Sequence, residues 1–181
     1  MEKRARVIYT SPMEIVDIVD EENKVLYQMS KDEAHDKGLL HRTIIVEVRN
    51  SQGQWLLVKQ APHKQDKDQY VNPVGGHIKA GESEIEAIKR ETEEETGIKV
   101  LDYIRIGNSI YNRFIRGKQE NHFFIIYQIT TDETPVLNDE SVEYRWFTEK
   151  ELKETIKNHP ELFGDSLFDV LKKFYPKVLA G

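Results

Sequence analysis

GHIKAGESEIEAIKRETEEETGI, residues 76–98, is the stretch of sequence that decides the fold. Within it, residues 82–95 hold seven glutamates and two basic residues, a net charge of −5 against −6 for the whole chain. Ser83 is a good helix N-cap, and Glu86 three residues later completes a capping box. Gly97 supplies the left-handed residue that commonly ends a helix. The stretch therefore predicts a helix over residues 84–96.

The predicted helix has an inward face next to an acidic face. With 100° between successive residues, the inward face carries Ile85, Ile88, Thr92 and Thr96. The acidic face carries Glu84, Glu91, Glu94 and Glu95. Carboxylates spaced in this way repel one another, and a hard divalent cation such as Mg²⁺ or Mn²⁺ would relieve the repulsion. On composition alone, a solvated acidic helix face is the commoner explanation.

The spacing of the whole stretch favours the metal site. Gly76 is followed by five residues, Glu82, seven residues and then RETEEETGI, residues 90–98. This pattern resembles the box of the Nudix hydrolase family and matches each of its fixed polar and glycine positions. The one departure is Thr92, where the family usually has an aliphatic residue. Because Thr92 lies on the inward face, the departure concerns packing and leaves the acidic residues intact.

The resemblance implies an α/β fold, a Nudix-type α/β/α sandwich with a mixed central sheet. Residues 1–181 would form a single domain, with an N-terminal hairpin over residues 13–29 and two C-terminal helices over 149–158 and 162–174. It also implies a pyrophosphohydrolase that cleaves a diphosphate linkage in a nucleoside diphosphate joined to another moiety, or in a related organic diphosphate. Water would attack phosphorus, with Mg²⁺ or Mn²⁺ as the cofactor.

Residue by residue, the resemblance assigns roles within the box. The metal ligands would be Glu91, Glu94 and Glu95, and the backbone carbonyl of Gly76 would also reach the metal. Glu82 matches the first glutamate of the box and is expected to support the site or to act as an outer ligand. On helical spacing alone, Arg90 lies four residues before Glu94 and can fix its rotamer.

The general base is expected among the acids that precede the last predicted strand. The family often carries an acidic residue there, and Glu140 and Glu143 are the two candidates. In a strand that includes residues 144–147, alternation directs Glu143 away from the face that carries Trp146. No pleat fixes the direction of Glu140, which precedes the strand. If Trp146 packs into the core, Glu140 is the expected base.

Composition narrows the class of the protein. A chain of 181 residues with 38% hydrophobic content is long enough for one domain with a core. The net charge of −6 argues against nucleic-acid or membrane-surface binding, since both favour a basic face. No span approaches membrane length and no apolar run follows the basic residues near the N-terminus, so a cytoplasmic location is expected. The resemblance implies a small-molecule diphosphate as the partner. The oligomeric state stays open, with a homodimer as one option.

The N-terminal part resembles Nudix proteins related to isopentenyl diphosphate isomerase. The likeness rests on the hairpin with Asp17 and Asp20, a short helix between Ser30 and Gly38, and His41 followed by an arginine. In these isomerases, histidines and glutamates bind one metal, while a cysteine and a glutamate handle protons on the alkene. This chain has no cysteine, and the segment expected to carry it reads YVNPV, residues 70–74. Isomerase activity is therefore not expected.

Six histidines, at positions 35, 41, 63, 77, 122 and 159, lack the close spacing typical of a zinc site. His41 and His77 are expected to be structural or to face the substrate. The polar loop over residues 61–72 is either a binding element or a plain connection. Strands are predicted over 99–107, 109–115 and 120–130. The hairpin tip between the last two strands carries Arg113, Arg116 and Lys118. These residues could contact phosphate, but a solvated turn is the simpler explanation.

Three functions follow from this reasoning. A metal-dependent hydrolase is favoured, because a protein without turnover has no physical reason to cluster repelling carboxylates. An isomerase-like enzyme and a non-catalytic nucleotide-binding regulatory module are the alternatives. The sequence leaves open the exact substrate, the number of metal ions and the identity of the base.

Overall fold

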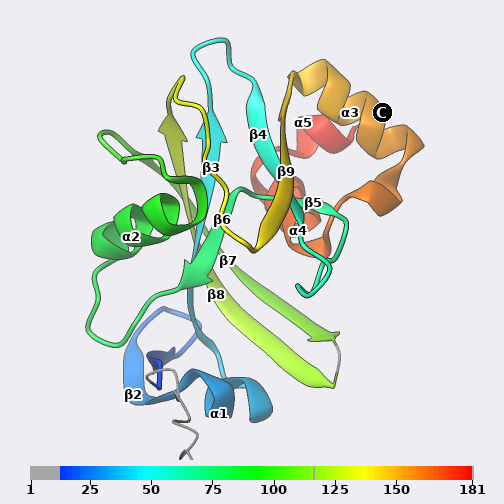
Figure 1. Cartoon of the computed structure of the whole chain (residues 1–181). Helices are drawn as coiled ribbons and strands as arrows, with labels where there is room; N and C mark the ends of the chain where they lie inside the picture. Colours follow the sequence, from blue (N-terminus) through cyan, green and yellow to red (C-terminus); the bar gives the residue numbers. More distant parts are fainter. Residues whose placement is uncertain (1–12, 116, 181) are drawn as a thin grey trace, which may run out of the picture.

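A mixed sheet of nine strands forms the centre of the structure, a computed structural model that describes residues 13–115 and 117–180 (Figure 1). The strands are β1 (Ile15–Val19), β2 (Val25–Ser30), β3 (His41–Arg49), β4 (Trp55–Gln60), β5 (Tyr70–Val71), β6 (Val74–His77), β7 (Ile104–Ile115), β8 (Lys118–Thr130) and β9 (Ser141–Phe147). The helices are α1 (Lys31–Asp36), α2 (Glu84–Thr96), α3 (Glu149–Asn158), the 3-10 helix η1 (Pro160–Leu162), α4 (Asp165–Phe174) and α5 (Pro176–Leu179).

Strand β3 is central because it pairs along both of its edges. It runs parallel to β8 over its whole length and antiparallel to β6, while shorter contacts join it to β1 and β4. Strand β4 continues the sheet to β5 and β9, and β8 continues it to β7. Helix α2 covers one face and α3, α4 and α5 cover the other (Figure 1). The predicted α/β/α sandwich with a mixed sheet is confirmed.

Alternate residues of the central strands divide between two cores. Ile44 and Val46 of β3 pack with Ile88 of α2 in the larger core. Ile45, between them, points to the opposite face and packs with Val170 of α4. This period of two is the geometry of a strand that is buried on both faces. The face that carries Ile45 also carries the residues of the cavity described below.

Helix α2 confirms the prediction from the box. It spans Glu84–Thr96, its N-cap Ser83 forms the capping box with Glu86, and Gly97 ends it with a φ of 68°. Thr92 is 0% exposed, so the departure from the family pattern is a packing difference, as expected. The N-terminal hairpin and the short helix after Ser30 are also confirmed.

Two predictions of secondary structure, the strands over 99–115 and the helix over 162–174, are wrong in part. Residues 99–103 are not part of a strand, and 104–115 form the single strand β7, whose pairing with β8 continues across a register shift between Arg105 and Gly107. The predicted helix over 162–174 is interrupted at Phe163, an extended residue whose ring is buried against the C-terminal helices. Of the predicted basic tip, Arg116 lies outside the described residues.

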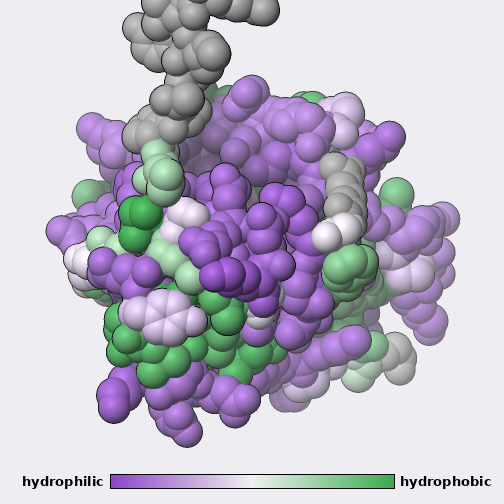
Figure 2. Space-filling model, turned by 90° about the horizontal axis from the view of Figure 1, so that it is seen from below, coloured by the Kyte–Doolittle hydropathy of each residue, from purple (hydrophilic) through white to green (hydrophobic). Residues whose placement is uncertain are grey.

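The surface is mainly polar at the end of the molecule that carries β2 and α1. Figure 2 views this end, where hydrophilic residues cover most of the surface and hydrophobic ones gather in one area. Strand β2 itself exposes Val25, Leu26 and Tyr27. Among the described residues, no helix has the length and apolar character needed to cross a bilayer.

Glu47 is a buried acid that connects the sheet to the C-terminal helices. It lies on β3 and is 1% exposed. The Tyr175 hydroxyl donates to its Oε2 at 2.6 Å, and the Arg49 guanidinium is 4.0 Å from the same oxygen. Burial raises the pKa of Glu47 to about 7, against the opposing effects of Tyr175 and Arg49. The hydrogen bond from Tyr175 therefore joins the end of α4 to a carboxyl group whose pKa is raised by burial.

Stability should fall with rising pH because of Glu47. Its folded pKa of about 7 lies above the ordinary 4.5, so its contribution is complete below about pH 4.5 and is lost as the pH rises through 7. Between pH 4.5 and 8.5, the free energy of unfolding should fall by up to about 3 kcal/mol relative to the variant Glu47→Gln. Urea unfolding at both pH values measures this difference. The control variant Glu154→Gln, which alters an exposed glutamate, should show the same pH dependence of the unfolding free energy as the wild type. If Glu47→Gln also shows that pH dependence, Glu47 is not its source.

Candidate active site

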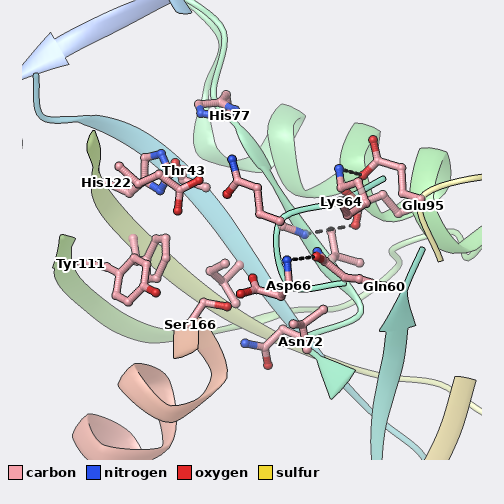
Figure 3. Close-up of a pocket in the computed structure, with 18 of the residues that line it drawn as sticks. Thr43, Gln60, Lys64, Asp66, Asn72, His77, Glu95, Tyr111, His122 and Ser166 are labelled. Atoms are coloured by element: carbon pink, nitrogen blue, oxygen red, sulfur yellow. Dashed lines mark hydrogen bonds and ion pairs between the residues drawn. The ribbon is translucent and has the colours of Figure 1, made fainter. Parts of the chain in front are cut away.

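A cavity of about 390 Å³ lies beside β3, between the loop of residues 61–69 and the strands β6, β7 and β8 (Figure 3). Glu95 of α2, Lys64 of the loop and Glu140 from the segment before β9 line one side of it. His77 and His122 line another part. The cavity therefore brings together the box helix and segments that are distant from it in the sequence.

Arg90 fixes the geometry of the acidic residues of the box. Its Nε and Nη2 donate to the two carboxylate oxygens of Glu82, both at 2.7 Å, and its Nη1 donates to Glu91 at 2.6 Å. The predicted contact with Glu94 is present, but at 3.5 Å it is the longest. Nη2 also donates to the backbone carbonyl of His77 at 3.1 Å. One guanidinium thus joins β6, the box loop and α2.

Gly76 gives Glu91 room to approach the backbone of β6. A Cβ atom at position 76 would lie 2.1 Å from the carboxyl carbon of Glu91 and within 2.4 Å of both of its oxygens. The buried Glu91 carboxylate therefore occupies the space that a side chain would fill. Burial raises the pKa of Glu91, and Arg90 opposes the shift while Glu94 adds to it.

Glu95 points into the cavity (Figure 3). Its Oε2 accepts a hydrogen bond from the backbone N–H of Gly75 at 3.1 Å. Burial raises the pKa of Glu95 to about 8, and the nearby carboxylates of Glu91 and Glu140 add to the shift. Glu95 is therefore close enough to both acids to be repelled by them, which is the condition that a divalent cation relieves.

The two candidates for the base lie in different places. Glu140 lines the cavity, and its Oε2 is 2.5 Å from the ammonium group of Lys64. Glu143 lies on β9 and accepts a hydrogen bond from the hydroxyl of Tyr70. Trp146 packs against the core under α2, as the preference for Glu140 required. Of the two acids, Glu140 is the one whose charge acts on Glu95.

Four histidines from four elements come together beside this cavity, and three of them, His35, His77 and His122, line it. They are His35 of α1, His41 of β3, His77 of β6 and His122 of β8, and their ligand atoms all lie within 4.8 Å of one another. The expectation of scattered histidines is therefore wrong. In the pairing of β3 with β8, His41 lies opposite His122. In the pairing of β3 with β6, His77 lies opposite Thr43, two residues after His41 on β3. We call these four residues the histidine quartet.

The quartet is neutral, and the Nε2 atoms of His35 and His77 share a hydrogen bond at 3.1 Å. Burial lowers the pKa of His41 to about 4 and holds those of His77 and His122 well below the ordinary value. Burial also lowers the pKa of His35, although Glu120 opposes the shift. His41 Nδ1 donates to the carbonyl of Leu39 at 2.7 Å, which leaves Nε2 unprotonated. Among the described residues, neither His41 Nε2 nor His122 Nε2 has a hydrogen-bond partner.

Two chemically different donor sets therefore meet at this cavity, where Glu95 represents the first set and His35, His77 and His122 represent the second. The carboxylates of the box form an oxygen set, which suits Mg²⁺ or Mn²⁺. The quartet forms a nitrogen set, which suits zinc and neighbouring transition metals. The cavity can accommodate an anionic substrate only if bound cations offset the carboxylates, since Lys64 and Arg113, the lysine and arginine that line it, are already paired with acids.

Residues 38–165 match the family model described as the NUDIX domain. The chain belongs to the Nudix family. A relative from Pectobacterium atrosepticum, named isopentenyl-diphosphate Delta-isomerase, is 31% identical over 154 residues, which cover 84% of this chain and 86% of the relative. An uncharacterized Nudix hydrolase from Nostoc sp. is 29% identical over 167 residues, which cover 90% of this chain and 96% of the relative.

Solved structures share the Nudix fold. A crystal structure of a Deinococcus radiodurans protein has a TM-score of 0.73 at 24% identity and covers 90% of this chain and 99% of its own. The Ap4A hydrolase of C. elegans has a TM-score of 0.54 at 20% identity and covers 77% of this chain and 98% of its own. The E. coli dihydroneopterin triphosphate pyrophosphohydrolase has a TM-score of 0.54 at 17% identity, with coverages of 75% and 94%. The NUDIX domain and the Nudix hydrolase relatives support the assignment of the chain as a pyrophosphohydrolase enzyme.

Several residues of the Nudix cavity were missed by sequence reasoning. Arg113 was expected in a solvated turn, but its side chain is 13% exposed and donates to Asp66 and Glu120. Lys64 and Asp66 belong to a loop without periodicity, so only its polar composition pointed to them. Glu84, predicted on the acidic face, instead accepts a hydrogen bond from Tyr127 at 2.7 Å.

Replacing Gly76 by alanine should displace Glu91. The added Cβ would overlap the end of a flexible side chain, so the fold should persist while the carboxylate moves. We expect Mg²⁺ affinity, measured by calorimetry, to fall about tenfold or more, the scale for disturbed ligand geometry. The matched control is Gly75→Ala, whose Cβ would meet only Ile45 at 3.4 Å and should leave the affinity unchanged. Equal affinities in the two variants would contradict the arrangement.

Proposed function

We propose that this Nudix enzyme uses Mg²⁺ or Mn²⁺ to hydrolyse a diphosphate linkage in a nucleoside diphosphate joined to another moiety, or in a related organic diphosphate. The observation that carries the proposal is that Glu95 and Glu140 line the cavity, with the carboxylate of Glu91 near Glu95. Structural neighbours named as an Ap4A hydrolase and a triphosphate pyrophosphohydrolase support a phosphoanhydride substrate.

The oxygen set fits a divalent cation of this kind. We assign Glu91, Glu94, Glu95 and the Gly76 carbonyl as its ligands. The side chain of Glu94 is 55% exposed and can turn toward an ion, whereas both oxygens of Glu82 are bonded to Arg90. Glu82 is therefore assigned a supporting role. When bound, the cation would neutralise phosphate oxygens and activate water.

The residues of this chain would share the remaining work of hydrolysis. Glu140 would accept the proton of the attacking water, because it lines the cavity beside Glu95. Lys64 would hold Glu140 in position through its contact at 2.5 Å. Arg90 would hold Glu91 in place through the bond at 2.6 Å, so that the ligand set is oriented before substrate arrives.

The histidine quartet favours a second candidate, an isomerase-like activity on a prenyl diphosphate. Isomerase-named relatives at up to 31% identity, and the use of histidine ligands by such enzymes, support this alternative. Against it, the chain has no cysteine to handle protons on an alkene. A non-catalytic module has no comparable support, because the acidic residues of the box are complete. Hydrolysis is therefore the preferred function.

A substrate screen separates these candidates. Nucleoside triphosphates, nucleotide sugars, dinucleoside polyphosphates, coenzyme A and prenyl diphosphates are incubated with the protein and Mg²⁺, then analysed by phosphate release and mass spectrometry. We expect hydrolysis of a phosphoanhydride, and Glu95→Gln should lower its rate by at least about two decades while the fold persists. Isomerised prenyl diphosphate without hydrolysis would reject the proposal, as would a fully active Glu95→Gln.

The two candidate bases should respond differently to substitution. Glu140→Gln should lower the rate of hydrolysis by about two to four decades, because a positioned base contributes on that scale, and should leave Mg²⁺ affinity nearly unchanged. Glu143→Gln is the matched control, since Glu143 is bonded to Tyr70 and does not line the cavity. A pH–rate comparison of the two variants measures the effect. A larger loss in Glu143→Gln would reverse the assignment.

A further inference from the structure

We propose that the end of the cavity formed by Asn72, Tyr111 and Ser166 binds the non-phosphate part of the substrate through hydrogen bonds. The enzyme would therefore act on diphosphates whose other moiety is polar, in preference to diphosphates of an apolar chain. We call these three residues the polar end of the cavity. The inference rests on the proposed function, because it names the substrate class of that same site.

The polar end lies away from the carboxylates of the cavity. Figure 3 shows Asn72, Tyr111 and Ser166 on the side of the cavity opposite Glu95 and Lys64. Three elements supply them: the connection between β5 and β6, strand β7 and the first turn of α4. An amide and two hydroxyl groups carry no net charge. The phosphates of a substrate would lie at the cation near the carboxylates, so its remaining part would extend toward the polar end.

Two groups of the polar end are buried without a partner. Asn72 is 7% exposed and Tyr111 is 8% exposed. Among residues 13–115 and 117–180, neither Asn72 Nδ2 nor the Tyr111 hydroxyl has a hydrogen-bond partner. Burial raises the pKa of Tyr111 well above its ordinary value, so the hydroxyl stays protonated and can donate. Most buried polar groups are paired, and an unpaired one costs free energy until a partner binds.

A ligand in the cavity can supply both missing partners, because both residues line the cavity. The terminal torsion of an asparagine is broad, so the amide of Asn72 can turn to meet a ligand. The required chemistry follows from the donors. Asn72 Nδ2 and the Tyr111 hydroxyl both donate, so the ligand must carry acceptors such as hydroxyl or carbonyl oxygens.

The ring of Tyr111 is held in place before a ligand arrives. It stacks on Phe124 with the ring centroids 4.9 Å apart and the planes at 15°. The guanidinium of Arg113 lies 5.6 Å from the centroid of the same ring, and Asp66 and Glu120 fix that guanidinium. A preorganised donor of this kind lowers the entropic cost of binding.

Close packing of α4 against β5 sets the position of Ser166. The backbone N–H of Gly164, just before α4, donates to the carbonyl of Tyr70 at 2.9 Å. A Cβ atom at Gly164 would lie 2.7 Å from Cγ1 of Val71, so only glycine allows this approach. The first turn of α4 therefore lies beside the segment that carries Asn72 (Figure 3).

An apolar chain would suit this end of the cavity poorly. It would cover Asn72 Nδ2 and the Tyr111 hydroxyl without supplying an acceptor. A site with hydrogen-bonding groups rejects an analogue that lacks the matching group, because its own buried groups stay unpaired. Ile45, Val74 and Phe124 also line the cavity and can contact the carbon skeleton of either kind of ligand. The polar end therefore separates the hydrolase candidate from the prenyl isomerase candidate.

The first test measures binding, so that it does not depend on turnover. Calorimetry in millimolar Mg²⁺ compares isopentyl diphosphate with its analogue that carries one hydroxyl group at the branched carbon. We expect the hydroxylated probe to bind about tenfold more tightly, the scale for pairing one buried polar group. Equal binding, tighter binding of the alkyl probe or no binding of either would overturn the proposal. A protein that shows the preference but hydrolyses no phosphoanhydride would refute the proposed function alone.

The second test removes the unpaired groups. Tyr111→Phe deletes only the hydroxyl, and Asn72→Leu replaces the amide with an apolar side chain of similar size. Each should lower the preference for the hydroxylated probe about threefold or more. The melting temperature of the free protein should stay the same or rise, because an unpaired buried polar group has been removed.

The matched controls are Tyr103→Phe and Asn108→Leu, which alter exposed residues that do not line the cavity. Both should keep the wild-type preference between the two probes. If Tyr111→Phe and Asn72→Leu lower the melting temperature and leave the preference unchanged, their groups are structural and the proposal is overturned.

Discussion

The hydrogen bonds of Arg90 are the interaction on which the carboxylate side of the cavity depends. Glu91 is buried next to the backbone of β6, and its burial would be unfavourable for a charged group without a partner. Arg90 supplies that partner and also binds both oxygens of Glu82, which precedes the helix. The fixed separation of Glu82 and Arg90 in the box allows this contact to form. The motif therefore describes a folding constraint as much as a set of ligands.

Strand β3 imposes the second constraint, since one of its faces carries most of what the cavity needs. His41 belongs to the quartet, Thr43 and Ile45 line the cavity, and Glu47 binds the C-terminal Tyr175. These positions alternate with the residues that pack under α2. A register shift of one residue would move all of them to the wrong face. Parallel pairing with β8 along the full strand opposes such a shift.

The parts of the structure that sequence reasoning predicted are those encoded locally. The box helix was predicted with its caps, because Ser83, Glu86 and Gly97 act within the helix itself. The quartet could not be predicted, because it needs the register of β3 with two other strands and the placement of α1. Arg113 was misjudged for the same reason: its partners Asp66 and Glu120 come from a distant loop and a neighbouring strand. The roles assigned to the box acids and to Glu140 stay predictions until variants are measured.

The neutral histidines in one part of the cavity and the carboxylates in another have different effects on an anionic substrate. A diphosphate substrate is anionic, and the carboxylates near Glu95 already repel it until a cation binds. A second carboxylate cluster would increase that repulsion. Neutral histidines add no negative charge, and Arg113 is paired with Asp66 and Glu120, which also line the cavity. This pairing offsets part of the negative charge along the wall that an anion must pass.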